Sequence, residues 1–196
     1  MLNKKAYFIR EHVGLLKLSD TYELLDPETS TQVGIAQEKP GLFVHVLRFL
    51  INKRLLPTQV FVYEGANAED QSRLLFSIKR GVALFQSKVE ICGKHGQPVG
   101  SLVSKLFSIG GAFRVYDASG REYALVQGDW KGWNFKITDT SGAEIGTLSK
   151  KWAGMGKEMF TSADNYMISL RDEPDAGSAI LLLAASLAVD TIYKER

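Results

Sequence analysis

The stretch Ala179–Val189, AILLLAASLAV, is an apolar run that only Ser186 interrupts. As an α-helix these residues rise roughly 17 Å, whereas the hydrocarbon core of a bilayer is about 30 Å thick. A helix that is apolar on every side but too short to span a membrane must be enclosed by protein. Because the rest of the chain is rich in short strand patterns, the sequence predicts a helix over residues 178–193 inside a closed β-sheet.

Four pairs of segments have the pattern of β-hairpins. Each pair has apolar residues alternating with polar ones, separated by a polar turn that contains glycine. Turn residues that tolerate positive φ between period-two segments favour hairpins. The predicted pairs join residues 22–26 to 33–35, 89–92 to 99–103, 113–117 to 123–126, and 135–139 to 145–148. Many short strands with regular turns are typical of a β-sandwich or β-barrel.

Three further segments have distinct patterns. Lys79–Arg80–Gly81 is predicted as the exposed turn of another hairpin, between strands at 76–78 and 82–85. Residues 65–72, GANAEDQS, are short enough for a hairpin loop. Residues 41–54 repeat apolar positions with a period of 3.6 and follow Pro40, which predicts one peripheral amphipathic helix.

Length and composition fit one globular domain over residues 1–196. The chain has 24 Lys and Arg against 22 Asp and Glu, so the overall charge indicates no particular partner, and we expect no nucleic acid. A single cysteine, Cys92, excludes an internal disulfide framework. The first fourteen residues contain no signal-peptide core, so we expect a cytoplasmic protein, with a peripheral position at the inner membrane face as the alternative.

Several motifs resemble the phospholipid scramblase family. The strongest is GAEIGTLSKKWAGMGKEMFTSADNY over residues 142–166, followed by the apolar helix that closes on Asp190; FQSKVEI at residues 85–91 is similar to a central strand of that family. The resemblance extends over residues 75–196, and over 20–74 in general pattern. The family belongs with the Tubby C-terminal-like superfamily, which includes the plant LURP-one-related proteins. The resemblance therefore implies a closed antiparallel barrel of about twelve strands around a central C-terminal helix.

The resemblance also directs attention to a calcium loop that eukaryotic scramblases carry in this region. Ser162 stands where those proteins have Asp, and Asp164 and Glu173 match their acidic positions. A hard cation takes six or more oxygen ligands, mostly carboxylates. These residues supply too few, so we expect a degenerate loop that holds no metal, and no cofactor.

Basic residues are the remaining candidates for a binding site. Tubby-like domains bind phosphoinositide headgroups through Lys and Arg on the barrel, so the resemblance implies possible headgroup contacts here. The candidates are Arg48, Lys53, Arg54, Lys79, Arg80 and Lys88. Neither Cys92 nor any of the three histidines has an evident nucleophile or base partner by spacing, so we expect no catalytic residues and no enzyme.

Three functions are compatible with these observations. The first is weak association with anionic phospholipid or phosphoinositide at a membrane surface. The second is a soluble scaffold that binds a protein partner and has no lipid role. The third is phospholipid scrambling itself, for which the terminal helix would have to leave the barrel and insert in the bilayer.

Overall fold

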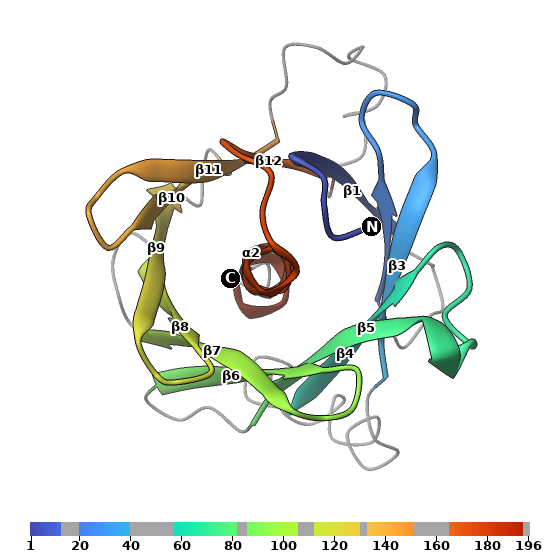
Figure 1. The fold of residues 1–196 in the computed structure, drawn as a ribbon, viewed down its shortest axis with the longest axis horizontal. Coiled ribbons are helices and arrows are strands. Elements are labelled where there is room, and N and C mark those ends of the chain that lie inside the picture. The colour runs from blue at the N-terminus through green and yellow to red at the C-terminus, as the bar shows by residue number, and fades with distance from the viewer. Residues whose placement is uncertain are drawn as a thin grey trace.

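The computed structural model describes residues 1–12, 20–39, 57–81, 86–105, 112–129, 133–150 and 165–193, which form twelve β-strands around one α-helix (Figure 1). The strands are β1 (Ala6–His12), β2 (Thr21–Leu25), β3 (Gln32–Glu38), β4 (Thr58–Glu64), β5 (Leu74–Arg80), β6 (Gln86–Gly93), β7 (Pro98–Lys105), β8 (Ala112–Asp117), β9 (Glu122–Asp129), β10 (Asn134–Asp139), β11 (Glu144–Ser149) and β12 (Tyr166–Leu170). The helix is α2 (Ala176–Tyr193), and a short 3₁₀ helix, η2 (Gln71–Arg73), precedes β5.

The strands form a closed up-and-down barrel. Each strand pairs antiparallel with the next along the chain, and β1 pairs with β12 in a register that places Ala6 opposite Ser169. This last pairing leaves no open sheet edge, which is the property that distinguishes a barrel from a sandwich. The predicted closed barrel of about twelve strands is confirmed.

The four predicted hairpins are confirmed as β2–β3, β6–β7, β8–β9 and β10–β11. In two of them the turn has the sequence Asp-x-Ser-Gly, and the glycines Gly120 and Gly142 have φ of 79° and 85°. Residues other than glycine rarely adopt this backbone conformation, so the position of the glycine determines where each strand ends. Residues 65–72 lie in the connection between β4 and β5, as predicted.

The prediction of an exposed turn at Lys79–Arg80–Gly81 is wrong. Strand β5 continues through Arg80, which lies opposite Thr58 of β4 and Val89 of β6. The alternation of side chains therefore does not stop at the charged pair: Lys79 points outward and Arg80 points into the barrel. The predicted strand at residues 82–85 and the predicted amphipathic helix at 41–54 lie outside the described residues.

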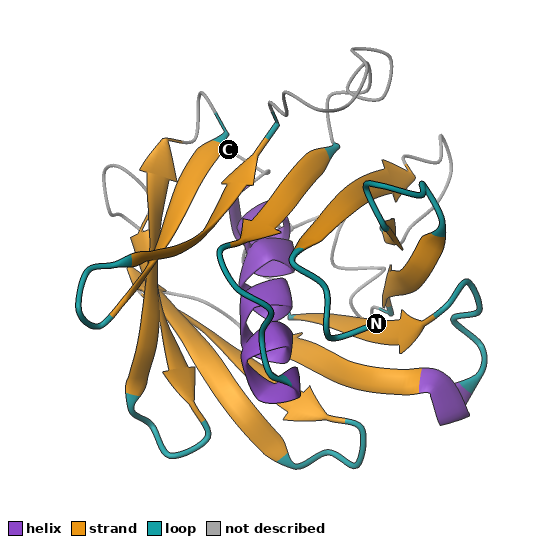
Figure 2. Cartoon of the chain, turned by 45° about the horizontal axis from the view of Figure 1, so that its top comes forward, coloured by secondary structure: helices purple, strands orange, loops and turns teal. Residues whose placement is uncertain are grey.

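Helix α2 runs through the interior of the barrel (Figure 2). It begins two residues earlier than predicted because the Asp175 side chain caps it, accepting hydrogen bonds from the Gly177 and Ser178 backbone N–H groups at 2.8 and 3.1 Å. Every side chain from Leu181 to Val189 is at most 4% exposed. The Ser186 hydroxyl donates to the Leu182 carbonyl at 2.7 Å, so the polar side chain in the run is satisfied within the helix.

The helix packs most closely against β6, β7 and β8. Gly100 of β7 makes this approach possible. A Cβ atom there would lie 2.5 Å from Leu181 Cδ2 and still closer to the Tyr116 carbonyl oxygen. Hence the backbone of β7 itself forms part of the surface on which the helix rests. No helix in the described part of the chain is both long and apolar enough to cross a membrane.

Replacing Leu183 with Asp should unfold the domain, because an unpaired carboxylate buried against the barrel wall costs several kcal/mol. Thermal unfolding followed by circular dichroism measures the effect. The matched control is Ala176→Asp, at the exposed first residue of α2, where negative charge favours the helix. A Leu183→Asp protein that melted like the wild type would contradict the buried position of α2.

Replacing Gly100 with Ala should lower the free energy of unfolding by about 1–3 kcal/mol, because the added methyl group overlaps Leu181 and the β8 backbone. Gly81→Ala is the control, since a Cβ atom there meets nothing within 4 Å. Urea unfolding of both variants tests the prediction. Equal midpoints would show that the helix does not approach β7 closely.

Candidate functional site

One end of the barrel carries a β-bulge in each of its five hairpins. We call it the hairpin end; it is also where β12 leads into α2 (Figure 2). In each hairpin the pairing shifts near the turn and leaves one residue of the second strand without an opposite partner. The five bulged residues are Val33, Leu75, Val99, Tyr123 and Ile145. All are apolar, partly buried and packed against the core.

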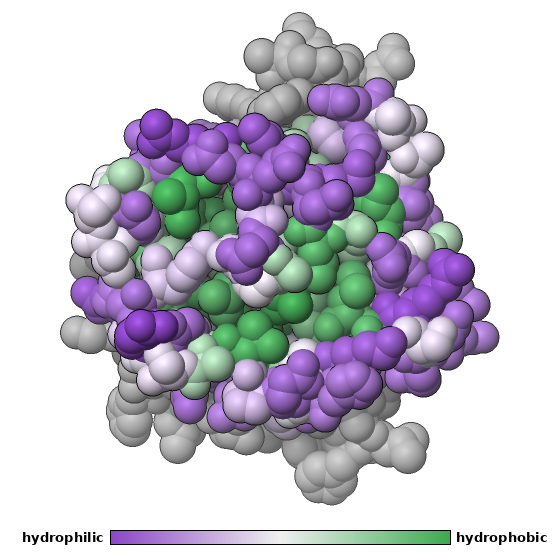
Figure 3. All heavy atoms as spheres, viewed as in Figure 1, coloured by the Kyte–Doolittle hydropathy of each residue, from purple (hydrophilic) through white to green (hydrophobic). Residues whose placement is uncertain are grey.

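A bulge changes the direction of a side chain relative to the regular strand. Here the five bulged residues gather with Met1, Leu2 and Ile180 into a group that we call the apolar mouth. Figure 3, which views the hairpin end, shows hydrophobic residues between the helix and the strands inside a ring of hydrophilic ones. The sequence shows strands that open with an apolar residue and often a glycine, but it does not show that they meet around one opening.

The hairpin end is rich in acidic residues. Its connecting segments are residues 1–5, 26–31, 64–73, 93–97, 117–121, 139–143 and 171–175, and they contain six Lys and Arg against ten Asp and Glu. The remainder of the chain therefore has 18 Lys and Arg against 12 Asp and Glu. The near-neutral total therefore combines a net negative hairpin end with an excess of basic residues in the rest of the sequence.

Much of this acidity has a structural cause. Asp117 Oδ1 accepts hydrogen bonds from the Ser119 N–H at 2.8 Å, the Ser119 hydroxyl at 2.6 Å and the Arg121 N–H at 3.0 Å. The Ser119 hydroxyl is the main reason that the pKa of Asp117 falls to about 2. Asp139 makes the same three contacts in its own turn, and its pKa is lowered chiefly by the Ser141 hydroxyl.

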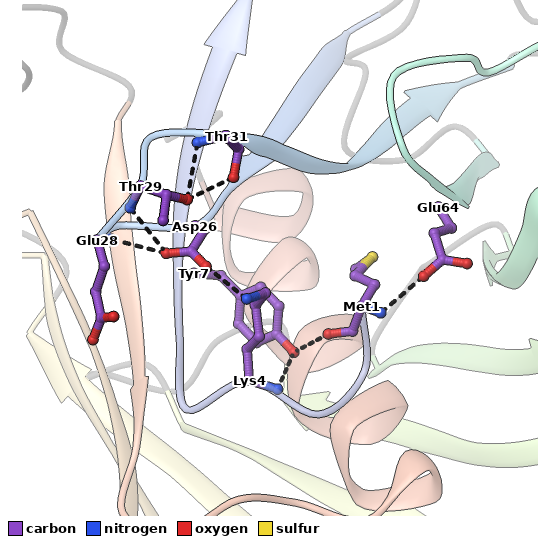
Figure 4. Close-up of polar contacts among 8 residues, drawn as sticks. All are labelled: Met1, Lys4, Tyr7, Asp26, Glu28, Thr29, Thr31 and Glu64. Atoms are coloured by element: carbon purple, nitrogen blue, oxygen red, sulfur yellow. Dashed lines mark hydrogen bonds and ion pairs between the residues drawn. The ribbon is translucent and has the colours of Figure 1, made fainter.

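The N-terminal segment is fixed across the hairpin end by ion pairs and hydrogen bonds (Figure 4). The Met1 ammonium lies 2.8 Å from Glu64 Oε1, and Lys4 Nζ lies 2.6 Å from Asp26 Oδ2. The hydrogen bond from Lys4 is the largest cause of the lowered pKa of Asp26. The Tyr7 hydroxyl donates to the Met1 carbonyl at 3.0 Å, and burial raises the pKa of Tyr7. These contacts join residues 1–7 to the β2–β3 and β4–β5 hairpins.

The structure places the predicted basic residues in different environments. Lys79 and Lys88 are exposed on the outer face of neighbouring strands, and Glu90 lies between them: it pairs with Lys79 across the strands and its Oε1 is 3.6 Å from Lys88 Nζ. Arg80, in contrast, is 6% exposed, and its guanidinium donates to the Thr58 hydroxyl at 3.2 Å inside the barrel. Arg80 is therefore not part of the exposed surface. Arg48, Lys53 and Arg54 lie outside the described residues.

Two other lysines contact aromatic rings on or near the barrel wall. Lys39 Nζ lies 5.3 Å from the Tyr63 ring centre and donates to the Tyr63 hydroxyl at 3.1 Å. Lys150 Nζ lies 4.3 Å from the centre of the Trp133 ring, which in turn packs on Tyr166 at a ring separation of 5.6 Å. In such cation–π contacts the ammonium group is attracted to the face of the aromatic ring. These two lysines therefore stabilise the strand ends on which they lie.

The segment compared with a calcium loop has a different role where it is described. Tyr166–Leu170 is β12, the strand that closes the barrel against β1, and Tyr166 and Ile168 are fully buried. Glu173 is exposed in the connection from β12 to α2, whereas Ser162 and Asp164 lie outside the described residues. Within the described ranges no group of three His, Cys, Asp or Glu side chains is placed to hold a metal ion.

Comparison with known proteins gives one match. The family model described as Scramblase matches residues 52–196, which contain β4 to β12 and α2. No curated protein and no solved structure matches the chain. The matched region is nearly three quarters of the sequence and includes the closing strand and the enclosed helix.

Stability should fall as the pH is lowered from about 4, the ordinary pKa of an Asp carboxyl group. The pKa values of Asp26, Asp117 and Asp175 are lowered in the folded state, so the unfolded chain takes up protons first. Their contribution is complete above about pH 4 and is lost as the pH approaches the folded values, about 2 for Asp117.

Urea unfolding at several pH values between 6 and 2 measures this dependence. Ser119→Ala removes the main hydrogen bond that lowers the pKa of Asp117, so this variant should lose less stability between pH 4 and pH 2 than the wild type. A wild-type stability that did not change over this interval would contradict the assigned turn contacts.

Proposed function

Since the chain belongs to the scramblase family, we propose that it is a lipid-binding module that associates weakly with anionic phospholipid at a membrane surface. The observation that carries this proposal is the net negative charge of the hairpin end, together with the excess of Lys and Arg in the rest of the sequence. An anionic surface repels the first and attracts the second, so the charge distribution selects an orientation.

Lys79 and Lys88 are the described residues best placed for this contact. Both are exposed, and both lie on the outer face of the barrel away from the hairpin turns. Each Lys or Arg near an anionic surface contributes about 1 kcal/mol, so a few together give weak and salt-dependent binding. Arg48, Lys53 and Arg54 are still proposed as headgroup contacts on the basis of the sequence. Arg80 is no longer proposed, because its side chain is buried.

The proposal assigns a binding role and no catalytic one. The carboxylates of Asp117 and Asp139 are engaged in turns, and their lowered pKa values make them poor proton donors near neutral pH. Scrambling by insertion of α2 would require the helix to leave the barrel and to expose the surface that Leu181–Val189 now bury. Binding by the folded barrel requires no such rearrangement.

The double variant Lys79→Gln/Lys88→Gln should bind vesicles of phosphatidylcholine and phosphatidylserine at least tenfold more weakly than the wild type, because two attractive charges are lost. Sedimentation at two salt concentrations measures the affinity, which should also fall as salt rises. Lys5→Gln/Lys94→Gln removes the same charge from exposed positions at the hairpin end and should bind like the wild type.

Wild-type protein that ignored anionic vesicles even at low salt would overturn the lipid proposal and favour a protein-binding scaffold. Equal losses in the two double variants would show that net charge, and not the position of Lys79 and Lys88, controls association.

A further inference from the structure

A groove of about 420 Å³ lies on β11 and β12 near the hairpin end. Its lining residues are Glu144, Gly146, Thr147, Ser169, Leu170 and Arg171. Its volume is within the range of about 300–1,000 Å³ that small-molecule sites occupy. None of these residues belongs to the basic surface proposed above.

The groove offers one charge of each sign. Arg171 is exposed at the end of β12, and its guanidinium makes no ion pair among the described residues. Glu144 is exposed at the start of β11, with Oε2 at 3.1 Å from Lys136 Nζ. A carboxylate can accept about four hydrogen bonds, so Glu144 retains capacity for a second cation.

Two hydroxyl groups also line the groove, one on each strand. Thr147 and Ser169 are directly opposite each other in the β11–β12 register, so their side chains share one face of the sheet. Ser169 Oγ is buried and has no hydrogen-bond partner among the described residues. A buried hydroxyl without a partner costs free energy. Because water does not reach this Oγ in the present structure, Ser169 would have to change rotamer to donate to an acceptor in the groove, and the new hydrogen bond would recover that cost.

The groove also borders the apolar mouth. The bulged residue Ile145 lies in the chain between Glu144 and Gly146, and it packs against the barrel core. Leu170 lines the groove and belongs to the same core. A molecule in the groove would therefore have its polar part beside Arg171 and Glu144 and an apolar surface next to it.

We propose that this groove binds the zwitterionic headgroup of a phospholipid, a phosphodiester that carries an ammonium group. Arg171 and the hydroxyls of Thr147 and Ser169 would donate to the phosphate oxygens, and Glu144 would accept from or attract the ammonium group. Arginine is well suited to the phosphate because its planar fork donates two parallel hydrogen bonds.

Charge distinguishes this ligand from an anionic one. The hairpin end has ten acidic against six basic side chains in its connecting segments, and Glu144 lies in the groove itself. These carboxylates repel a free phosphate or an anionic headgroup. A zwitterion has no net charge, and its ammonium group turns the Glu144 carboxylate from a repulsive neighbour into a partner.

The inference rests on the proposed lipid binding only for the class of ligand. In the orientation proposed above the groove faces away from an anionic surface, so it would bind a single lipid molecule and not one within that surface. Glycerophosphocholine reaches the groove without any membrane contact, so failure of the groove experiment is distinguishable from failure of the vesicle experiment. Loss of binding to anionic vesicles would remove the basic surface from the account and leave the groove unaffected.

Nitrogen-15 NMR titration of the full chain with glycerophosphocholine tests the groove. Resonances of residues 144–147 and 169–171 should shift, while inorganic phosphate alone and choline alone should bind at least tenfold more weakly, because each provides half of the contacts. Short-chain phosphatidylcholine below its micelle concentration distinguishes a lipid from a soluble headgroup. Tighter binding than glycerophosphocholine indicates that the acyl chains use the apolar mouth, and equal binding overturns the lipid source.

Arg171→Gln should weaken glycerophosphocholine binding at least tenfold. Glu144→Gln should also weaken it, but should strengthen the binding of inorganic phosphate because a repulsive charge is removed. Lys94→Gln, an exposed lysine at the same end and outside the groove, is the control and should bind like the wild type. Absence of groove shifts, inorganic phosphate that binds as well as glycerophosphocholine, or an unchanged affinity in Arg171→Gln would overturn the proposal.

Discussion

The burial of α2 is the constraint on which the rest of the structure depends. The side chains of this helix from Leu181 to Val189 are all apolar except Ser186. The folded state is therefore destabilised wherever one side of the helix faces water. A two-layer arrangement covers only one side of a helix. A sheet closed on itself covers every side, and the pairing of β1 with β12 provides that closure.

The position of the helix explains why the two ends of the barrel differ. Helix α2 enters the barrel at the hairpin end, where the connections between strands are short. Asp side chains accept hydrogen bonds from the backbone of the turns and of the first turn of α2. These caps make the end acidic, and the bulges place apolar side chains around the helix start. One requirement, enclosure of a helix by hairpins, thus produces both the acidic hairpin end and the apolar mouth.

Much of the fold could be predicted from the sequence because local signals agreed with the tertiary structure. The Asp-x-Ser-Gly turns at residues 117–120 and 139–142 end strands wherever they occur, and the length of the apolar run indicated an enclosed helix. The error at Lys79–Arg80 has a physical reason. Two charges followed by a glycine resemble a turn, but Thr58 gives Arg80 a polar partner inside the barrel, so the strand continues.

The candidate sites were less predictable because they depend on pairing between distant segments. A bulge adds a single residue to one strand, and the residues on each side of it still alternate between apolar and polar. The sequence of a single hairpin therefore does not show where its bulge lies. The groove requires Thr147 to lie opposite Ser169, and the sequence of neither strand shows this register. Nothing in the sequence distinguishes Arg171 from other charged residues. It becomes a candidate phosphate-binding residue only because it lines a groove with Glu144 and the two hydroxyls.

The central claim, that α2 and the barrel form one cooperative unit, is tested most directly by native-state hydrogen exchange. The amides of residues 181–189 should exchange only through global unfolding, with the same free energy and the same dependence on denaturant as the central amides of β6, β7 and β8. Helix amides that exchanged through a separate opening of lower free energy, while the strands stayed protected, would show that the helix can leave an intact barrel. That result would contradict the account.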